Sequence, residues 1–556
     1  MFKKVLSLVL ALIMIMAVFV GCGKKKTNIA DETSEKTTEA KTTSEKTTEA
    51  KTTMVKDDEE ENTEGATTRP SISIDYTANT DITFDDTTIY DEMTIEQLLK
   101  PENFEGSDIP DDRDYGGYEF KVLVDEVNFR YEFLDQSDGD IVKEAVINRQ
   151  KWIEEYVGID FVFNEMYGGY GSTMNDYASE IEAASGSGNP YDLALAYSHI
   201  PPIVAAKGLS KDLAESVNLN LHNTTKEYWG SGIKEEIMIG GRIFWMSDNS
   251  SWDSVRNLLC VFVNTEFFAR ANEGFDQTDL YAMVYGGTWT FENMLLFIQN
   301  TYENTNDADP SVDDGDTFGL LSQTYSYSLE NWLYGAGFSL TKLNNRGTYE
   351  WTLADQMFID FSDWWQSTLF DDEDIYSAGS KTMFGAGRAM FAMAPLKIIE
   401  DQLELDYTVL PLPIYDPNIK NEYSTPILND YGSWLIPKAL KNDSFERSAT
   451  VLELIAAEGN RRIAPVYFEI YLKRQNAGHD VDMQKMFNII RNAIVFDIGF
   501  LYGSVLTVED TSELFLQMRR LWRGKLEFNS LTTFWATYQQ TATTKLNNLM
   551  VDILDY

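Results

Sequence analysis

The chain has 556 residues and a formal net charge of −44, with 89 acidic residues against 45 Lys and Arg. A chain this acidic is poorly suited to nucleic acid, because the phosphate backbone requires a basic protein surface. Two cysteines and three histidines argue against a His/Cys zinc site, and we expect neither a metal ion nor a cofactor.

The N-terminus has the pattern of a bacterial lipoprotein signal. Lys3 and Lys4 precede an uncharged apolar stretch at 5–20, which is shorter than the about 20 apolar residues of a spanning helix and favours a secretory signal. The following "FVGC" resembles a lipobox, whose cysteine is lipidated after cleavage. We expect residues 1–21 to be the signal peptide and Cys22 to carry palmitate and other acyl chains. An ordinary secretory signal and an uncleaved anchor stay open as alternatives.

The next segment has the composition of a disordered spacer. The ten residues 33–42 recur unchanged at 43–52, and an acidic run follows at 57–64. Dense charge and few aliphatic residues cannot form a core. We therefore interpret residues 22–85 as the lipidated cysteine plus a disordered spacer, with a mean reach on the order of 45 Å. The globular body is predicted at 86–556.

The body begins with alternating strand and helix patterns. Apolar residues alternate within 116–126 at Phe120, Val122 and Val124, recur at helical spacing over 140–158, and alternate again over 159–166. A helix ended by Gly and Pro and the short apolar strand at 191–197 follow. This order predicts a mainly parallel sheet flanked by helices, and the roughly 440 residues after Gly116 favour two lobes over one core.

Several segments, taken in order, resemble a known family. They are "GDIVKEAVINRQKWIEEYVGIDF", "NPYDLALAYSHIPPIVAAKGLSKDL", "IGGRIFWMSDNSSWDSVRNLLCVFVNTEFF", "GGTWTFENMLLFIQN", "FGAGRAMFAMAP", "YTVLPLPIYD" and "GSWLIPKALKNDSFERSATVLELIA". Their order and spacing resemble the extracellular solute-binding lipoproteins of ABC importers, in the carbohydrate-type branch.

The resemblance implies a two-lobed α/β fold of the periplasmic-binding-protein type, each lobe a mainly parallel sheet flanked by helices, with hinge crossings between the lobes. It also implies a receptor without enzymatic activity that binds a small solute, expected to be a sugar, and delivers it to the permease subunits of an ABC transporter. Such a protein is held by its lipid on the outer face of a bacterial cytoplasmic membrane.

Lobe boundaries follow from the same reasoning. We predict lobe 1 at about 115–255 and 395–430, and lobe 2 at about 256–394 and 431–556. The crossings between the lobes are predicted near 255–263, 390–398 and 428–434. Cys260 lies in an apolar strand and is expected to be a buried, inert thiol.

Candidate ligand contacts are aromatic and polar residues near strand ends. Ligands of open α/β sheets bind beyond the carboxyl ends of the strands. Aromatic rings stack on sugar faces, while carboxylate, amide and guanidinium groups bond the hydroxyls. By its position in the resemblance, Trp535 is expected to supply a stacking face. The predicted contacts are Tyr197, His199, Asp248, Trp252, Arg256, Tyr327, Trp332, Asp430, Trp434 and Trp535, and for each a packed structural position stays open.

Two other function classes stay open. A secreted, lipid-anchored carbohydrate-active enzyme is one, although we find no nucleophile elbow, P-loop or HExxH motif. A cell-surface adhesive protein is the other, although no repeat continues beyond the spacer. The acidic stretch 304–316 lacks the spacing of an EF-hand loop, so an acidic turn is favoured over a calcium site.

Overall fold

We describe a computed structural model of the chain. It describes residues 90–555, except for the single residues 128, 170, 172 and 527 and the segments 222–226, 230–235, 248–250, 306–310, 323–327, 370–371, 378–380, 417–421 and 510–511. The predicted signal peptide, Cys22 and the spacer lie outside the described residues. Among the helices of the described part, none combines the length and the apolar character needed to cross a membrane.

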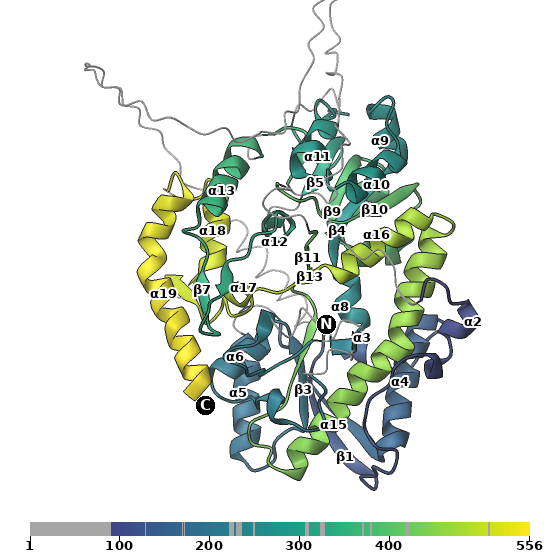
Figure 1. Ribbon diagram of the computed structural model, residues 1–556, viewed down its shortest axis with the longest axis vertical. Helices are drawn as coiled ribbons and strands as arrows, with labels where there is room; N and C mark the ends of the chain where they lie inside the picture. Colours follow the sequence, from purple (N-terminus) through teal and green to yellow (C-terminus); the bar gives the residue numbers. More distant parts are fainter. Residues whose placement is uncertain are drawn as a thin grey trace, which may run out of the picture. The chain divides into compact units, whose positions relative to one another are not determined.

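Lobe 1 is built on a four-stranded sheet in the order β12-β3-β1-β2, of which Figure 1 labels β1 and β3. Strand β1 pairs in parallel with both β2 and β3, and β12 closes the sheet as an antiparallel edge strand. The predicted strand–helix pattern is therefore confirmed in this lobe. The strands are β1 (Tyr118–Asp125), β2 (Ile159–Met166), β3 (Leu193–Tyr197) and β12 (Gly432–Leu435).

Helix α4 shows how the sequence specifies these elements. Asp140 caps it by accepting hydrogen bonds from the backbone N–H groups of Val142 and Lys143, and Gly158 ends it with a φ of 63° that favours glycine. Its apolar stripe is buried in the core. The main helices of lobe 1 are α4 (Ile141–Val157), α5 (Thr173–Gly186), α6 (Ile200–Ala206) and α15 (Asp443–Glu458); shorter ones are α3 (Phe129–Glu132), η2 (Leu213–Glu215) and η3 (Glu227–Trp229).

Lobe 2 is built on a five-stranded sheet in the order β10-β4-β9-β5-β8. Two of its pairings are parallel and two are antiparallel, so this sheet is more mixed than the expected mainly parallel one. The strands are β4 (Leu259–Asn264), β5 (Phe318–Ser322), β8 (Ile375–Tyr376), β9 (Ala389–Pro395) and β10 (Tyr407–Leu410). The helices around it are α9 (Thr265–Ala271), α10 (Gln277–Tyr285), α11 (Phe291–Ile298), α12 (Ser328–Gly335), α14 (Lys381–Gly385), η4 (Leu396–Asp401) and α16 (Val481–Asn492).

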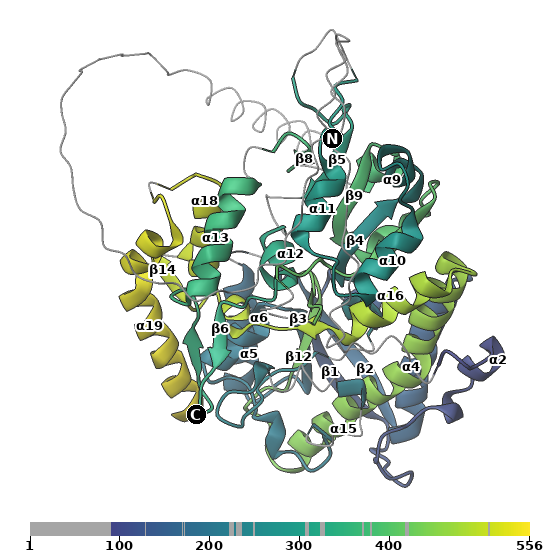
Figure 2. The same cartoon turned by 45° about the horizontal axis from the view of Figure 1, so that its top comes forward.

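A helical group that includes the C-terminal segments lies beside these sheets. Figure 2 shows α13, α18 and α19 running side by side, and contacts join α18 and α13 to α19 and α19 to α6. Its helices are α13 (Gln356–Thr368), α17 (Ile498–Leu501), α18 (Leu514–Trp522) and α19 (Leu531–Asp555). Its short ribbons are β6 (Thr341–Leu343) with β7 (Tyr349–Trp351), and β14 (Thr507–Glu509) with β15 (Ser512–Glu513).

The chain crosses between the two sheets at three places. It first leaves lobe 1 through α8 (Trp252–Arg256) and enters β4, and it later returns through β11 (Thr425–Pro426) to β12. These two crossings touch, because Leu258 and Ile427 form a bridge and the Leu428 N–H donates to the Asn257 carbonyl at 2.8 Å. They agree with the predictions near 255–263 and 428–434.

The third crossing is helical. The helix α15 continues through the π-helical stretches η5 (Gly459–Ile463) and η6 (Pro465–Ala477), which contact α4 and then α16 of lobe 2 (Figure 1). The chain then reaches β13 (Ile494–Val495), which pairs with β11 between the lobes. Along this helical crossing lies an N-terminal segment with α2 (Ile95–Leu98) and η1 (Pro101–Asn103).

The predicted third crossing near 390–398 is wrong. Strand β9 pairs with β4 and β5, and the next strand, β10, pairs with β4, so this stretch stays in lobe 2. The assignment of 395–430 to lobe 1 is therefore wrong for β10. The assignment of 431–556 to lobe 2 is wrong for β12 and α15, which pack in lobe 1.

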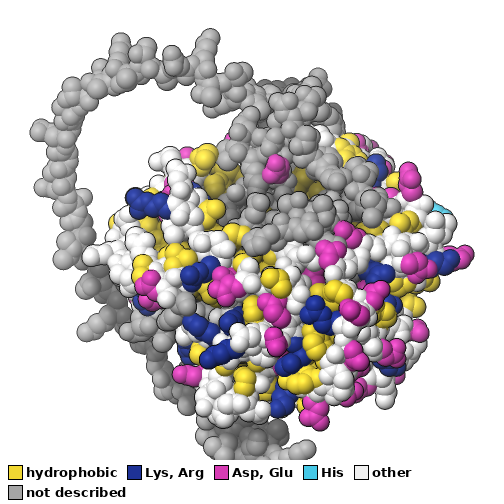
Figure 3. Space-filling view, turned by 60° about the horizontal axis from the view of Figure 1, so that its bottom comes forward, with side chains coloured by type: hydrophobic (Ala, Val, Ile, Leu, Met, Phe, Trp, Pro, Cys, Tyr) yellow, Lys and Arg dark blue, Asp and Glu magenta, His cyan; other side chains and the backbone are white. Residues whose placement is uncertain are grey.

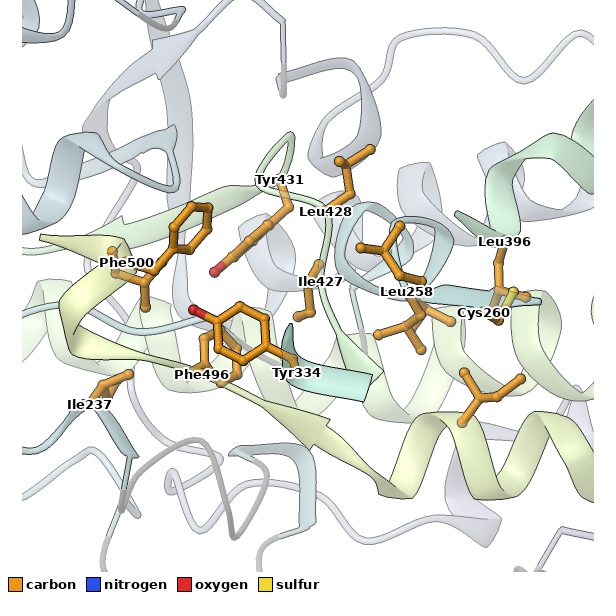
Figure 4. Packing of buried hydrophobic residues seen from close by; sticks show 14 of the residues in the cluster. Ile237, Leu258, Cys260, Tyr334, Leu396, Ile427, Leu428, Tyr431, Phe496 and Phe500 are labelled. Atoms are coloured by element: carbon orange, nitrogen blue, oxygen red, sulfur yellow. The ribbon is translucent and has the colours of Figure 1, made fainter. Parts of the chain in front are cut away.

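A hydrophobic core runs through the crossings. Figure 4 shows Leu258, just before β4, near Ile427 of the returning crossing, with Cys260 of β4 beside Leu396 on one side and Tyr334, Tyr431 and Phe496 on the other. Cys260 is fully buried, as predicted, and burial raises the pKa of its thiol well above the ordinary value. On the face drawn in Figure 3, the Lys and Arg side chains of the described residues are interspersed with Asp and Glu, without a continuous basic patch.

Candidate ligand-binding site

The carboxyl end of β1 carries a buried acid that the sequence analysis did not single out. Asp125 is fully buried; its Oδ1 accepts from the Val127 N–H at 3.2 Å and from the Gly168 N–H at 3.3 Å. Its Oδ2 has no hydrogen-bond partner within the described part of the chain. Burial raises the pKa of Asp125 above its ordinary value. The available signal was an acid directly after the alternating run "YEFKVLV".

The carboxyl end of β3 brings the predicted Tyr197 and His199 together. Their rings stack with centroids 5.5 Å apart, and His199 meets the ring of Phe500 edge-on at 4.9 Å. Burial lowers the pKa of His199 to about 4, so the imidazole is neutral near pH 7. Both side chains are buried, and they connect lobe 1 to helix α17.

A small cavity lies where β11, β13, α12 and α17 meet, and we call it the hinge cavity. Four aromatic side chains from these segments line it, and Figure 4 shows Tyr334, Tyr431, Phe496 and Phe500 around the same space. Its volume is about 20 Å³, enough for roughly one water molecule. The lining residues are Glu330, Tyr334, Pro426, Ile427, Tyr431, Val495, Phe496, Asp497, Phe500 and Leu501.

The two acids of the hinge cavity differ in their hydrogen bonds. Asp497 accepts from the Leu340 N–H, the Thr341 hydroxyl at 2.7 Å, the Gly499 N–H at 2.8 Å and the Tyr334 hydroxyl at 3.1 Å. Glu330 is 4% exposed, and its Oε2 has no hydrogen-bond partner among the described residues. Burial raises the pKa of Glu330 to about 7. The sequence analysis missed both acids, because neither lies in a recognisable motif.

Helix α8 places Trp252 and Arg256 in a contact between the lobes rather than in the hinge cavity. Arg256 forms an ion pair with Glu400 of η4, with Nε 3.0 Å from Oε1, and its guanidinium lies 4.2 Å over the ring of Tyr131. The Trp252 Nε1–H donates to the same carboxylate at 3.1 Å. Burial alone would lower the pKa of Arg256, but the hydrogen bonds and charge of Glu400 raise it.

Asp430 and Trp434 have different environments. The Asp430 side chain is half-exposed at the returning crossing, 3.2 Å from the Lys397 ammonium of lobe 2. Trp434 is buried in β12, and its ring meets Phe133 edge-on at 6.0 Å within lobe 1. Trp434 therefore fills the core as an inward-facing sheet residue and does not line the hinge cavity, and its role as a ligand contact stays a prediction.

Trp332 and Trp535 are also buried away from the hinge cavity. The Trp332 Nε1–H donates to the Ser322 hydroxyl at 2.9 Å, and the ring stacks on Phe291 at 4.6 Å. Trp535 packs on α19 near Trp351, with ring centroids 6.3 Å apart. Neither ring lines the cavity, so neither presents the predicted stacking face there. Asp248 and Tyr327 lie outside the described residues.

The described acids do not gather into a metal site. In the part of the chain that the structure describes, no group of three or more His, Cys, Asp or Glu side chains could hold an ion. Where the acidic stretch 304–316 is described, Asp316 accepts from the backbone N–H groups of Thr305 at 3.1 Å and Asp313 at 3.2 Å. These are the bonds of an acidic turn, the interpretation favoured from the sequence.

Two α/β lobes joined by three crossings, with the crossing strands β11 and β13 between them, define the two-lobed fold of periplasmic binding proteins. The expected fold class is confirmed.

Comparisons with other proteins find similar solved structures at low sequence identity. No protein-family model and no curated protein matches the chain. A binding protein for cyclic alpha-maltosyl-1,6-maltose from Arthrobacter globiformis is similar over 78% of this chain and 100% of its own, at 11% identity and a TM-score of 0.49. The galacto-N-biose-/lacto-N-biose I-binding protein of the ABC transporter from Bifidobacterium longum is similar over 78% of this chain and 98% of its own. The sequence identity is 15% and the TM-score is 0.47. An ABC substrate-binding protein from Listeria monocytogenes, in complex with cycloalternan, is similar over 79% of this chain and 98% of its own. The sequence identity is 11% and the TM-score is 0.45.

Proposed function

We propose that this protein is a lipid-anchored extracellular receptor that reversibly binds a small solute, a carbohydrate, between its two lobes and delivers it to an ABC import permease. The observation that carries the proposal is the hinge cavity, an aromatic-lined space at the crossing strands between two α/β lobes. Solutes of open α/β sheets bind beyond the carboxyl ends of strands, and Asp125, Tyr197 and His199 lie at two such ends.

The lining chemistry favours a carbohydrate. Sugar rings present C–H faces that pack on aromatic side chains, and the cavity offers Tyr334, Tyr431, Phe496 and Phe500. Sugar hydroxyls need acceptors, and Glu330 supplies one in the cavity, because its Oε2 has no hydrogen-bond partner among the described residues. The cavity holds only about one water molecule. A whole sugar ring therefore requires the lobes to separate first and then close around it, which is the motion that hinge crossings permit.

The first experiment tests reversible binding without turnover. A carbohydrate panel is screened by thermal shift, because a ligand of the native state raises stability by RT ln(1 + [L]/Kd). The best hit is then titrated by calorimetry and recovered for NMR. We expect saturable binding and an unchanged ligand; consumption of the sugar would contradict the receptor and support an enzyme.

A pair of variants tests the location of the solute. Phe496→Leu removes an aromatic face from the hinge cavity, and we expect it to raise the Kd by about ten- to a hundredfold. Phe268→Leu makes the same change in the lobe 2 core, where Phe268 packs on Phe297 and Phe391, and should leave the Kd unchanged. Equal changes in Kd in both variants would indicate that the solute does not bind at the hinge cavity.

The anchor is tested separately. Acylation requires the thiol of Cys22, so Cys22→Ala should release the protein from membranes into the medium while solute binding persists. Retention of the variant on the membrane would support an uncleaved apolar anchor.

A further inference from the structure

The carboxyl group of Glu330 is the starting observation. It is 4% exposed, lines the hinge cavity, and has an Oε2 without a hydrogen-bond partner in the described structure. A buried carboxylate without a partner costs several kcal/mol, so such groups are retained where a ligand or a proton completes them. The other cavity acid, Asp497, has four donors of its own and does not share this deficit.

No cationic side chain among the described residues lines the hinge cavity beside Glu330. Arg519 of α18 acts on Glu330 through its charge, yet this does not outweigh burial. Half of the eight lining residues other than the two acids are aromatic, and aromatic faces attract cations through the negative potential above the ring. The cavity therefore combines an uncompensated acid with aromatic walls.

We propose that the hinge cavity is a subsite for a primary ammonium group carried by the captured solute, with Glu330 as its counter-ion. The inference rests on the proposed function, because the solute supplies the ammonium group. It narrows the solute class from carbohydrates to amino-bearing ones such as amino sugars. An ammonium group supplies three donors, so it can bond Glu330 Oε2 and still face the rings.

Size selects among cations. A cavity of about 20 Å³ accepts a group the size of water, which an unsubstituted ammonium matches. A tetramethylammonium ion is several times larger and does not fit the space as it stands. Potassium is close to ammonium in size, but it needs six or more oxygen ligands, whereas four of the ten lining residues present aromatic rings.

The charge of Glu330 makes the subsite pH-dependent. Glu330 becomes anionic as the pH rises through about 7, and only the anion pairs with ammonium. The charged and titratable groups that face it are Asp497 from the N-cap of α17, Tyr334 from its own helix, Tyr431 from the returning crossing, and Arg519 from α18. The two tyrosines stay neutral, because burial raises the pKa of each well above its ordinary value.

The test uses free ions with the full chain. Thermal unfolding is followed in ammonium, potassium and tetramethylammonium chloride at equal ionic strength, at pH 8 and pH 5.5. We expect ammonium alone to raise the melting temperature at pH 8, by about 1–2 °C at a concentration several times its Kd, and not at pH 5.5. Glu330→Gln should abolish this response.

A matched variant controls for the loss of a buried acid. Glu469 is also buried, but it pairs with Lys473 at 2.9 Å, so Glu469→Gln should keep the ammonium response. If Glu330→Gln does not fold, the loss of the response at pH 5.5 in the unmodified protein tests the same charge. An equal rise in melting temperature with all three cations, or no rise with ammonium, would overturn the inference. Glu330 would then be neutralised by a bound proton and not by a cationic ligand.

Calorimetry separates this inference from the proposed function. Glucosamine is compared with glucose at pH 7, where its amino group is mostly protonated and Glu330 is partly anionic, alongside the best neutral hit of the carbohydrate panel. Tighter binding of the amino sugar, lost in Glu330→Gln, supports the inference. Binding of neutral sugars with no preference for the amino sugar overturns the inference and leaves the receptor intact. If ammonium raises the melting temperature but no solute binds, the cation site is supported and the proposed receptor function is contradicted.

Discussion

Two groups of side chains join lobe 1 to lobe 2, and they differ in how completely their polar atoms are satisfied. The first is the interlobe ion cluster of Arg256, Glu400, Trp252, Tyr131 and Tyr467, in which three side chains donate to the Glu400 carboxylate. The second is the hinge cavity, in which Glu330 keeps an oxygen without a partner in the described chain. Both are largely buried, so burial alone does not distinguish them.

A solute gains binding free energy where it completes a buried polar group that lacks a partner. A saturated cluster offers a ligand nothing that it does not already have, and breaking it costs the desolvation of two charges. A cavity with an unpaired acid and aromatic walls gains from any group that completes it. By the same reasoning, Trp252 and Arg256 gain little from a ligand while they bond Glu400, and their role as ligand contacts stays a prediction.

The largest expected effect breaks the ion cluster. Arg256→Ala leaves the Glu400 carboxylate without its cation in a largely buried site, and we expect a loss of about 3 kcal/mol in the free energy of unfolding. Urea denaturation measures it. Lys381→Ala removes a cation from an exposed pair with Asp401 and should cost under about 1 kcal/mol, which makes it the control. Similar losses in both variants would refute the distinction.

The second prediction is a substitution that increases the free energy of unfolding instead of lowering it. The pKa of Glu330 is about 7 in the folded protein against an ordinary value of 4.5, so its contribution to stability is lost as the pH rises from 4.5 to 7. Glu330→Gln should therefore stabilise the protein at pH 8 by up to about 3 kcal/mol and change little at pH 4. Denaturation at both pH values checks this, and destabilisation at pH 8 would imply a cationic partner.

The third prediction concerns the neutral imidazole beside the cavity. The folded pKa of His199 is about 4 against an ordinary 6.5, so its stability contribution is present above pH 6.5 and lost as the pH falls toward 4. We expect it to account for about 2–3 kcal/mol of the loss between pH 7 and 4.5. His199→Gln should flatten that part of the pH profile. A variant profile parallel to the parent would exclude this role.

The smallest change in the free energy of unfolding is expected at a third contact between the lobes. Lys397 and Asp430 form a partly exposed pair between the lobes, with side-chain exposures of 24% and 44%. Solvent screens such a pair, so Lys397→Ala should cost about 0.5 kcal/mol at low salt and less at high salt. A loss as large as that of Arg256→Ala would place this pair within the interlobe ion cluster.

Local patterns predicted lobe 1 well and lobe 2 less well. Helix α4 carries its cap, apolar stripe and terminating glycine within one segment, and β1, β2 and β3 follow the βαβ order. Strand β10 joins β4 from about 140 residues away, and β12 joins β3 from more than 230 residues away. Such pairings follow from packing of the whole chain, which periodicity does not record.

The site was less predictable for the same reason. Tyr197 and His199 follow a predicted strand, so their place at the end of β3 could be predicted from the sequence, and their role as ligand contacts stays a prediction. Trp434 and Trp332 were chosen because tryptophan suits sugars, yet the core uses the same rings. Glu330 and Asp497 lie far apart in sequence and share a cavity only through the meeting of α12 and α17. One weak signal was available, an acid in the first turn of a helix whose other residues are mostly apolar.

Hydrogen exchange tests most directly whether the solute binds at the hinge. The free protein is compared with the protein saturated by the best hit of the carbohydrate panel, and protection is mapped by peptide. We predict slower exchange in 425–431 and 494–501, which carry β11, β13, Tyr431, Phe496 and Phe500, with little change in α4. Saturation that leaves both segments unchanged would contradict the account.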